Sequence, residues 1–260
     1  MATSRARVVS SFTLVKGSLI EETYTAFQAW DTSQSKKENL DRLKAANAFG
    51  SGSATWQRDV AKVLNRRFEP ATRDLPLVEL AKGGCAMELW KPILLWHMTR
   101  DEFLLRDFLA TWLFRQWEEG AYRIHSEDLE PYLKGLGKRK VSVSEEWSET
   151  TLKRVASGLL RIATDFGLLR GTQAREFVQY HLPDDALLYL ILAMTAGRRS
   201  TRRAIDSDDW RMYLMDSADL ERELLRLHQY GALEYQVAGS VVHLRLPHAS
   251  PLEYVRSLTA

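Results

Sequence analysis

The chain has 260 residues, enough for two or three small domains that each bury a core. Its 36 basic residues face 34 acidic ones, and the resulting net charge of only +2 excludes a histone-like or tail-type polybasic protein. Cys85 is the only cysteine, so a disulfide within the chain and a zinc-finger spacing are both excluded, as expected in a reducing cytoplasm.

The longest apolar runs span residues 92–98 and 186–196. Both are shorter than the roughly 20 residues that cross a bilayer, so we expect both to be buried helices. The N-terminal segment MATSRARVVSSF contains arginines but no apolar run of signal-peptide length. These features favour a cytoplasmic protein with no membrane partner.

Residues 1–119 are predicted to form a helical domain. The expected helices span residues 18–30, 36–48, 54–68, 77–81, 86–97 and 100–119, and most of them carry apolar residues at helical spacing. The last helix is rich in Leu and Trp and is expected to lie at the centre of the core. Asp101 and Glu102 fall in its predicted first turn, where negative charge complements the helix dipole.

A first winged-helix-like unit is predicted over residues 120–182. After a short helix at 126–134 and a basic loop at 134–140, Ser148 can cap an amphipathic helix that Gly167 ends. The buried stripe of this helix is Leu152, Val155, Leu159, Ile162 and Phe166. Residues 168–170 and 177–180 are candidate strands with Gly171 between them. This order is typical of a winged helix-turn-helix, whose last helix can enter a major groove.

The same pattern, though not the same sequence, recurs over residues 183–260. A helix capped by Asp184 or Asp185 is expected to run to Thr195, and Ser217 is expected to cap a second helix that Gly231 ends. Two strands, 233–237 and 241–246, then form a hairpin around Gly239-Ser240. The predicted fold is therefore mainly α, with an N-terminal helical bundle followed by two winged-helix-like units with short β-hairpins.

Positive charge is concentrated in the first of these units. Residues 131–175 contain nine basic and four acidic side chains, a net charge of +5. Local charge of this kind attracts nucleic acid even when the whole chain is nearly neutral. The predicted phosphate contacts are Lys138, Arg139 and Lys140 in the loop, Lys153, Arg154, Ser157 and Arg161 on the helix, the cluster Arg198, Arg199, Arg202 and Arg203, and Arg245 on the second hairpin. Alternatively, the loop is simply solvated, and the arginine cluster pairs with nearby aspartates or with an acidic protein surface.

No motif predicts catalysis. The sequence has no GxxxxGK[ST] phosphate loop, and residues 50–55 resemble only half of a GxGxxG with no strand before it. His97 lies among apolar residues and is expected to be a hydrogen-bonded core histidine. Capping and charge neutralisation explain Asp206, Asp208 and Asp209 without a metal. We therefore expect a non-enzymatic protein with no cofactor and no metal.

The segment from Ser11 to Glu22, with Lys16-Gly17 at its centre, resembles the opening of BrxA proteins of bacterial BREX (bacteriophage exclusion) systems. The Leu/Trp-rich region from Glu88 to Leu109 is also similar to that family. The resemblance implies a cytoplasmic antiviral-defence protein with a NusB-like helical N-terminal part. It also implies binding to double-stranded DNA and partnership with other BREX subunits, and it offers no catalytic residues.

Charge pattern and resemblance together predict a largely sequence-tolerant binder of double-stranded DNA. Acidic residues such as Asp165, Glu221 and Glu223 interrupt the basic faces, which favours modest affinity and little base readout. One alternative is a protein-interaction adaptor or scaffold within the defence complex, since winged units often dock partners and eight tryptophans leave room for an exposed aromatic patch. Another is RNA binding through the helical bundle, with contacts from Arg58, Lys62, Arg66 and Arg67.

Overall fold

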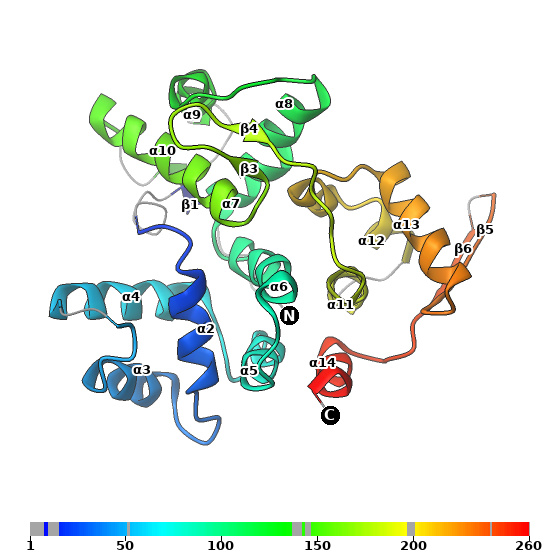
Figure 1. The fold of residues 1–260 in the computed structure, drawn as a ribbon, viewed down its shortest axis with the longest axis horizontal. Helices are drawn as coiled ribbons and strands as arrows, with labels where there is room; N and C mark the ends of the chain where they lie inside the picture. The colour runs from blue at the N-terminus through cyan, green and yellow to red at the C-terminus, as the bar shows by residue number, and fades with distance from the viewer. Residues whose placement is uncertain are drawn as a thin grey trace.

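A computed structural model describes residues 8–9, 16–50, 53–136, 142–143, 147–196, 201–239 and 241–259. This part of the chain is mainly helical and carries small two-stranded sheets (Figure 1), so the predicted mainly α class is confirmed. Within it, no helix is both long and apolar enough to span a membrane. A single cluster of buried apolar side chains extends from Leu19 to Val255. The proposed division at residues 120 and 183 stays a prediction.

The N-terminal helices form where the sequence pattern predicts them; the first three are one to four residues shorter than predicted, and the next two are one to three residues longer. They are α2 (Ile20–Gln28), α3 (Lys36–Ala45), α4 (Ala54–Arg67), α5 (Leu75–Lys82) and α6 (Met87–Thr99). Ser35 begins α3 with a capping box, and the Ser53 side chain accepts a hydrogen bond from the Trp56 amide at the start of α4. Helix α3 packs on α4, and α2 packs on α5.

The predicted helix from residue 100 to 119 is built differently. It consists of α7 (Phe103–Asp107), the π-helical turn η1 (Phe108–Leu113) and α8 (Phe114–Glu118). The expectation that Asp101 and Glu102 occupy its first turn is wrong. Glu102 has a non-helical backbone, and both carboxylates are turned into the protein, where they pair with arginines rather than with the helix dipole.

The central region is organised around one long amphipathic helix. Its elements are η2 (Ser126–Leu129), α9 (Glu130–Gly135), α10 (Glu149–Asp165), β3 (Leu169–Arg170) and β4 (Glu176–Phe177). Ser148 caps α10 through the Thr151 amide, and Gly167, with φ of 80°, follows its end, so both predictions are confirmed. The second strand begins one residue earlier than predicted and is shorter. Next to it, Ile124 pairs with Arg175 and adds a third extended segment that the sequence pattern does not indicate.

A separate pair of short strands brings the N-terminal segment beside this region. β1 (Val8–Val9) pairs in parallel with β2 (Ser142–Val143), with Val8 opposite Ser142. Strand β1 also contacts α7.

The C-terminal region contains the predicted helices and hairpin, with different caps. Its elements are α11 (Asp184–Thr195), α12 (Thr201–Ile205), η4 (Asp208–Tyr213), α13 (Ser217–Gln229), β5 (Glu234–Ala238), β6 (Val241–Arg245) and α14 (Pro251–Thr259). Asp216, not Ser217, caps α13, because its carboxylate accepts from the Asp219 amide. Asp184 and Asp185 do not cap α11. Instead, Asp184 binds Arg226, and Asp185 accepts from the Tyr254 hydroxyl. Helix α14 was not predicted.

The C-terminal region packs on the N-terminal helices at three main places. Helix α11 packs on α6, α14 packs on α5, and η4 packs on η1. At the second contact Gly83 leaves room for α14, since a Cβ at this position would lie only 2.0 Å from Cγ2 of Thr259.

A buried hydrogen-bond chain lies at the α6–α11 contact. Nδ1 of His97 is 2.6 Å from a carboxylate oxygen of Asp74, and Nε2 is 2.6 Å from the Tyr189 hydroxyl. The prediction of a hydrogen-bonded core histidine is confirmed. Burial lowers the pKa of His97, so the neutral ring donates to Asp74 and accepts from Tyr189. Burial opposes ionisation of Asp74, but hydrogen bonds from His97 and Arg73 hold the pKa of that carboxyl well below its usual range.

The lowered pKa of buried His97 makes the free energy of unfolding depend on pH. Below pH 6.5, the usual pKa of histidine, the unfolded chain takes up a proton that folded His97 does not, so unfolding becomes easier as pH falls. Between pH 7 and 5 we expect His97 to contribute a loss of up to about 2 kcal/mol in the free energy of unfolding. Urea unfolding at both pH values should show a smaller loss for His97→Gln than for the wild type. Exposed His243→Gln is the control, and equal pH dependence for all three proteins would contradict the prediction.

Candidate nucleic-acid interface

The predicted basic face of α10 exists. Val155, Leu159 and Ile162 are fully buried, and the opposite side of the helix leaves four predicted side chains in solvent: Lys153, Arg154, Ser157 and Arg161. Among the residues that the structure describes, no ion pair involves the three cations of this set. Their charges are therefore available to a ligand.

These side chains line a groove of about 500 Å³ whose other wall includes Gly17. Gly17 has a φ of +86°, a conformation that favours glycine. In the sequence, Lys16-Gly17 is only the centre of a segment that leads into the first predicted helix. Its position beside α10 is a long-range contact that no local pattern indicates.

Four hydrogen bonds hold residues 16–18 between α4 and α10. Nζ of Lys16 lies 2.6 Å from a carboxylate oxygen of Asp59 on α4. The Ser18 hydroxyl donates to Asp165 at the end of α10, over 2.7 Å. Arg67 donates to the carbonyl oxygens of Gly17 and Ser18 at 2.9 and 3.0 Å. Asp165 is thus used within the protein, where it anchors the N-terminal segment.

Arg67 is itself fully buried. Its Nε lies 3.5 Å from a carboxylate oxygen of Glu102, whose side chain is only 4% exposed. The RNA alternative is therefore wrong in including Arg67 among its contacts, because no ligand reaches this side chain. Arg58 and Lys62 are exposed, and Arg66 is half-buried, with its Nε 4.0 Å from a carboxylate oxygen of Glu102.

The remaining predicted contacts are not brought to this face. Lys138, Arg139, Lys140, Arg198 and Arg199 lie outside the described residues. Arg202 pairs with Asp206 at 2.7 Å and with Glu221 at 3.6 Å, and Arg245 pairs with Glu234 at 3.4 Å. Arg203 is exposed on the same helix as Arg202. Helix α12 packs on β6, far from α10 in Figure 1.

The neutralisation of the C-terminal aspartates follows the sequence interpretation. Asp206, Asp208 and Asp209 each form an ion pair with an arginine, namely Arg202, Arg211 and Arg106. Within the described part of the chain, no group of His, Cys, Asp and Glu side chains has the arrangement of a metal site.

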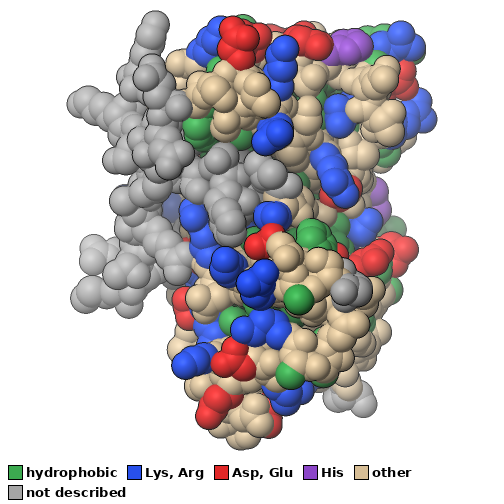
Figure 2. All heavy atoms as spheres, turned by 90° about the vertical axis from the view of Figure 1, so that its left-hand side faces the viewer, with side chains coloured by type: hydrophobic (Ala, Val, Ile, Leu, Met, Phe, Trp, Pro, Cys, Tyr) green, Lys and Arg blue, Asp and Glu red, His purple; other side chains and the backbone are tan. Residues whose placement is uncertain are grey.

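Lys and Arg side chains spread over the face of the molecule shown in Figure 2. They extend from the level of α9 and α10 at the top to that of α3 and α4 at the bottom. Acidic side chains are interspersed among them, as the small net charge requires.

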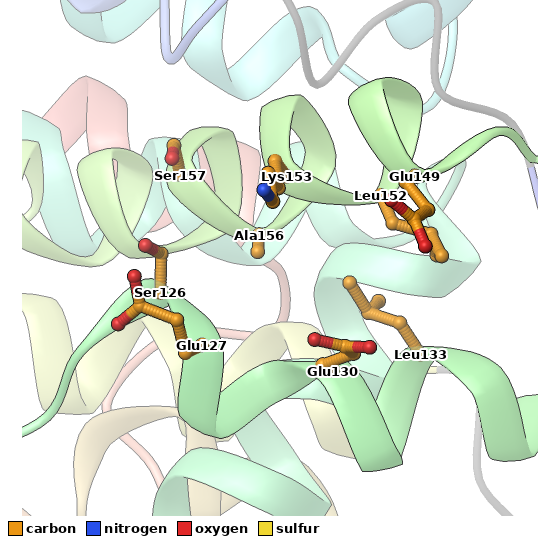
Figure 3. A pocket seen from close by; sticks show the side chains of 9 residues that line it. All are labelled: Ser126, Glu127, Glu130, Leu133, Glu149, Leu152, Lys153, Ala156 and Ser157. Atoms are coloured by element: carbon orange, nitrogen blue, oxygen red, sulfur yellow. The ribbon is translucent and has the colours of Figure 1, made fainter.

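The other flank of α10 is acidic. A pocket of about 400 Å³ between α10 and the η2–α9 segment has Leu133, Leu152 and Ala156 among its lining residues. Figure 3 shows Glu127 and Glu130 on the η2–α9 segment, below α10. Glu149 and Lys153 extend from α10 itself. Glu130 is paired with Lys134 at 2.5 Å. The negative charge of Glu127 still repels phosphates, so they are disfavoured on this flank and favoured on the Gly17 side of α10.

Comparison with known proteins adds one finding. The BrxA family model matches residues 11–192 of the chain. The match covers the N-terminal helices, the groove beside Gly17 and most of α11, and it stops before α12. No curated protein matches the chain, and no solved structure does.

The buried position of Arg67 predicts a large stability effect. Arg67→Met leaves Glu102 buried without its nearest guanidinium and leaves two carbonyl oxygens without this donor, so we expect a loss of about 3 to 5 kcal/mol in the free energy of unfolding. Exposed Arg58→Met on the same helix is the matched control and should change this free energy by less than about 0.5 kcal/mol. Urea unfolding measures both. Equal midpoints for the two variants would contradict the assignment.

Proposed function

The chain belongs to the BrxA family, and from this premise we propose that it is a DNA-binding component of a BREX bacteriophage-defence system. It holds double-stranded DNA mainly through phosphate contacts and performs no chemistry on it. Other BREX subunits are its expected protein partners.

The observation that carries this proposal is the face of α10 beside Gly17. Lys153 and Arg161 are eight residues apart, which corresponds to about 12 Å along a helix. Phosphates of one B-DNA strand follow each other every 3.4 Å or so along the duplex axis. Lysines and arginines spaced in this way can neutralise several successive phosphates, and the apolar underside of α10 holds them on a rigid element.

We interpret the region around α10 as a winged helix. The extended segment at Ile124, the η2–α9 segment, α10 and the β3–β4 hairpin occur in the order of that fold, with α10 in the place of the recognition helix. This interpretation supports the proposed unit of residues 120–182. Because Gly17 shares the groove with α10, the duplex meets the helix and the N-terminal segment together, which favours backbone contacts over base readout.

The second proposed unit, residues 183–260, is assigned a different role. Arg202 and Arg245 are occupied by carboxylates, while Val237 and Val241 on the β5–β6 hairpin are 48% and 68% exposed. Paired arginines and exposed valines favour protein docking over phosphate binding. The adaptor hypothesis therefore applies to the β5–β6 hairpin of this unit. Lys138, Arg139, Lys140, Arg198 and Arg199 remain predicted DNA contacts.

Charge reversal on α10 tests the DNA assignment. We expect Lys153→Glu/Arg154→Glu to abolish binding to a fluorescein-labelled duplex of about 30 base pairs at low salt, because two phosphate contacts become repulsive. Fluorescence anisotropy over several salt concentrations measures the affinity. Arg202→Glu/Arg245→Glu is the matched control and should leave the affinity nearly unchanged. No binding by the wild type at low salt would refute the function.

The acidic flank should weaken binding. Glu127→Gln removes one negative charge beside α10, so we expect duplex affinity to rise by about two- to fivefold at low salt and the gain to shrink as salt screens the charge. The same anisotropy assay measures the change. Exposed Glu234→Gln on the distant hairpin is the control, and an equal gain in both variants would mean that only net charge matters.

A further inference from the structure

A second basic groove lies between α3 and α4. It has a volume of about 460 Å³ and is lined by four cations, Lys37, Lys44, Arg58 and Lys62, together with Asp41 and Asn65. Buried Leu40 and Ala61 are also among its lining residues, so the two helices are packed beneath the charged rim.

The positive charge of this groove is only partly neutralised. Lys44 pairs with Asp41 at 2.8 Å, and the nearby Asp59 is engaged by Lys16. Among the described residues, neither Lys37 nor Lys62 forms an ion pair. Four cations face one lining carboxylate, which leaves a net charge of +3.

The spacing of these cations fits a nucleic-acid backbone. Lys37 and Lys44 are seven residues apart, about 10 Å along α3, and Arg58 and Lys62 are four residues apart, about 6 Å along α4. These separations are of the order of the distance between phosphates along one strand, so each helix can contact more than one phosphate.

The second groove is linked to the first by an ion pair, although the two grooves share no lining residue. Asp59 lies on α4 between Arg58 and Lys62 and holds Lys16, and the next residue, Gly17, lines the groove beside α10. Residues 16–17 therefore connect α4, which lines the second groove, with the groove beside α10. The helices that line these grooves, α10, α4 and α3, lie at the levels of Figure 2 where Lys and Arg side chains are seen.

We propose that the α3–α4 groove is a second phosphate-binding site for the same DNA duplex, which runs from α10 across Lys16-Gly17 to Lys37 and Lys62. This inference rests on the proposed function and extends it, because it assigns a DNA contact to the N-terminal helical region. A single duplex engaged at both grooves binds as one ligand, with the second contact made intramolecularly.

The test compares salt dependence in the full chain. Lys37→Ala/Lys62→Ala removes two exposed cations, so the slope of log affinity against log salt for a duplex of about 30 base pairs should become shallower by about 1.8. Between 50 and 200 mM salt, concentrations chosen for the experiment, the variant should then lose about tenfold less affinity than the wild type. Lys82→Ala/Arg256→Ala, at exposed positions on α5 and α14, is the matched control and should keep the wild-type slope.

Variants at both grooves separate one duplex from two. Lys153→Ala/Arg154→Ala should lower the slope by a similar amount, and combining all four substitutions should lower it by about 3.6 with one duplex bound per chain. Two duplexes per chain, or an unchanged slope for Lys37→Ala/Lys62→Ala, would overturn the inference while leaving the α10 site intact. Binding of single-stranded RNA that needs Lys37 and Lys62, with duplex binding unaffected, would also overturn it. A wild type that binds no duplex removes the proposed function itself.

Discussion

One buried guanidinium fixes the arrangement on which the candidate interface depends. Arg67 has no exposed surface, and its partners are the carbonyl oxygens of Gly17 and Ser18 and the carboxylate of Glu102. A buried charge is tolerated only when it is paired and hydrogen-bonded. Arg67 therefore holds together three parts of the chain: the end of α4, the segment before α2 and the residue before α7. Ser18 in turn donates a hydrogen bond to Asp165 on α10 and connects that helix to the same assembly.

The electrostatic design follows from that assembly. Gly17 lies on one side of α10, beside its lysine and arginines, while carboxylates such as Glu127 occupy the other side. A phosphate backbone is attracted to the first side and repelled from the second. The proposed DNA contact therefore needs no large net charge, because the sign of the charge changes across a single helix.

Local patterns in the sequence predict α10 well and long-range contacts poorly. The Ser148 cap, the apolar stripe, Gly167 and the exposed face are all determined within one helix, so periodicity and capping chemistry are sufficient. Asp216 and Ser217 are adjacent residues of equal capping ability, and only the backbone conformation decides between them. The burial of Glu102 and the place of Gly17 beside α10 depend on residues far away in the chain, which no spacing rule reveals.

The packing of α14 on α5 has a consequence for synthesis of the chain. Helix α5 ends at Lys82 and α14 begins at Pro251, so one apolar surface of the N-terminal helices is completed only by residues made much later. While the ribosome produces the intervening segment, that surface has no partner in the nascent chain. Late, non-local closure of this kind slows folding and prolongs the exposure of aggregation-prone surface. A chaperone that covers the α5 surface during translation would therefore act where the growing polypeptide needs protection.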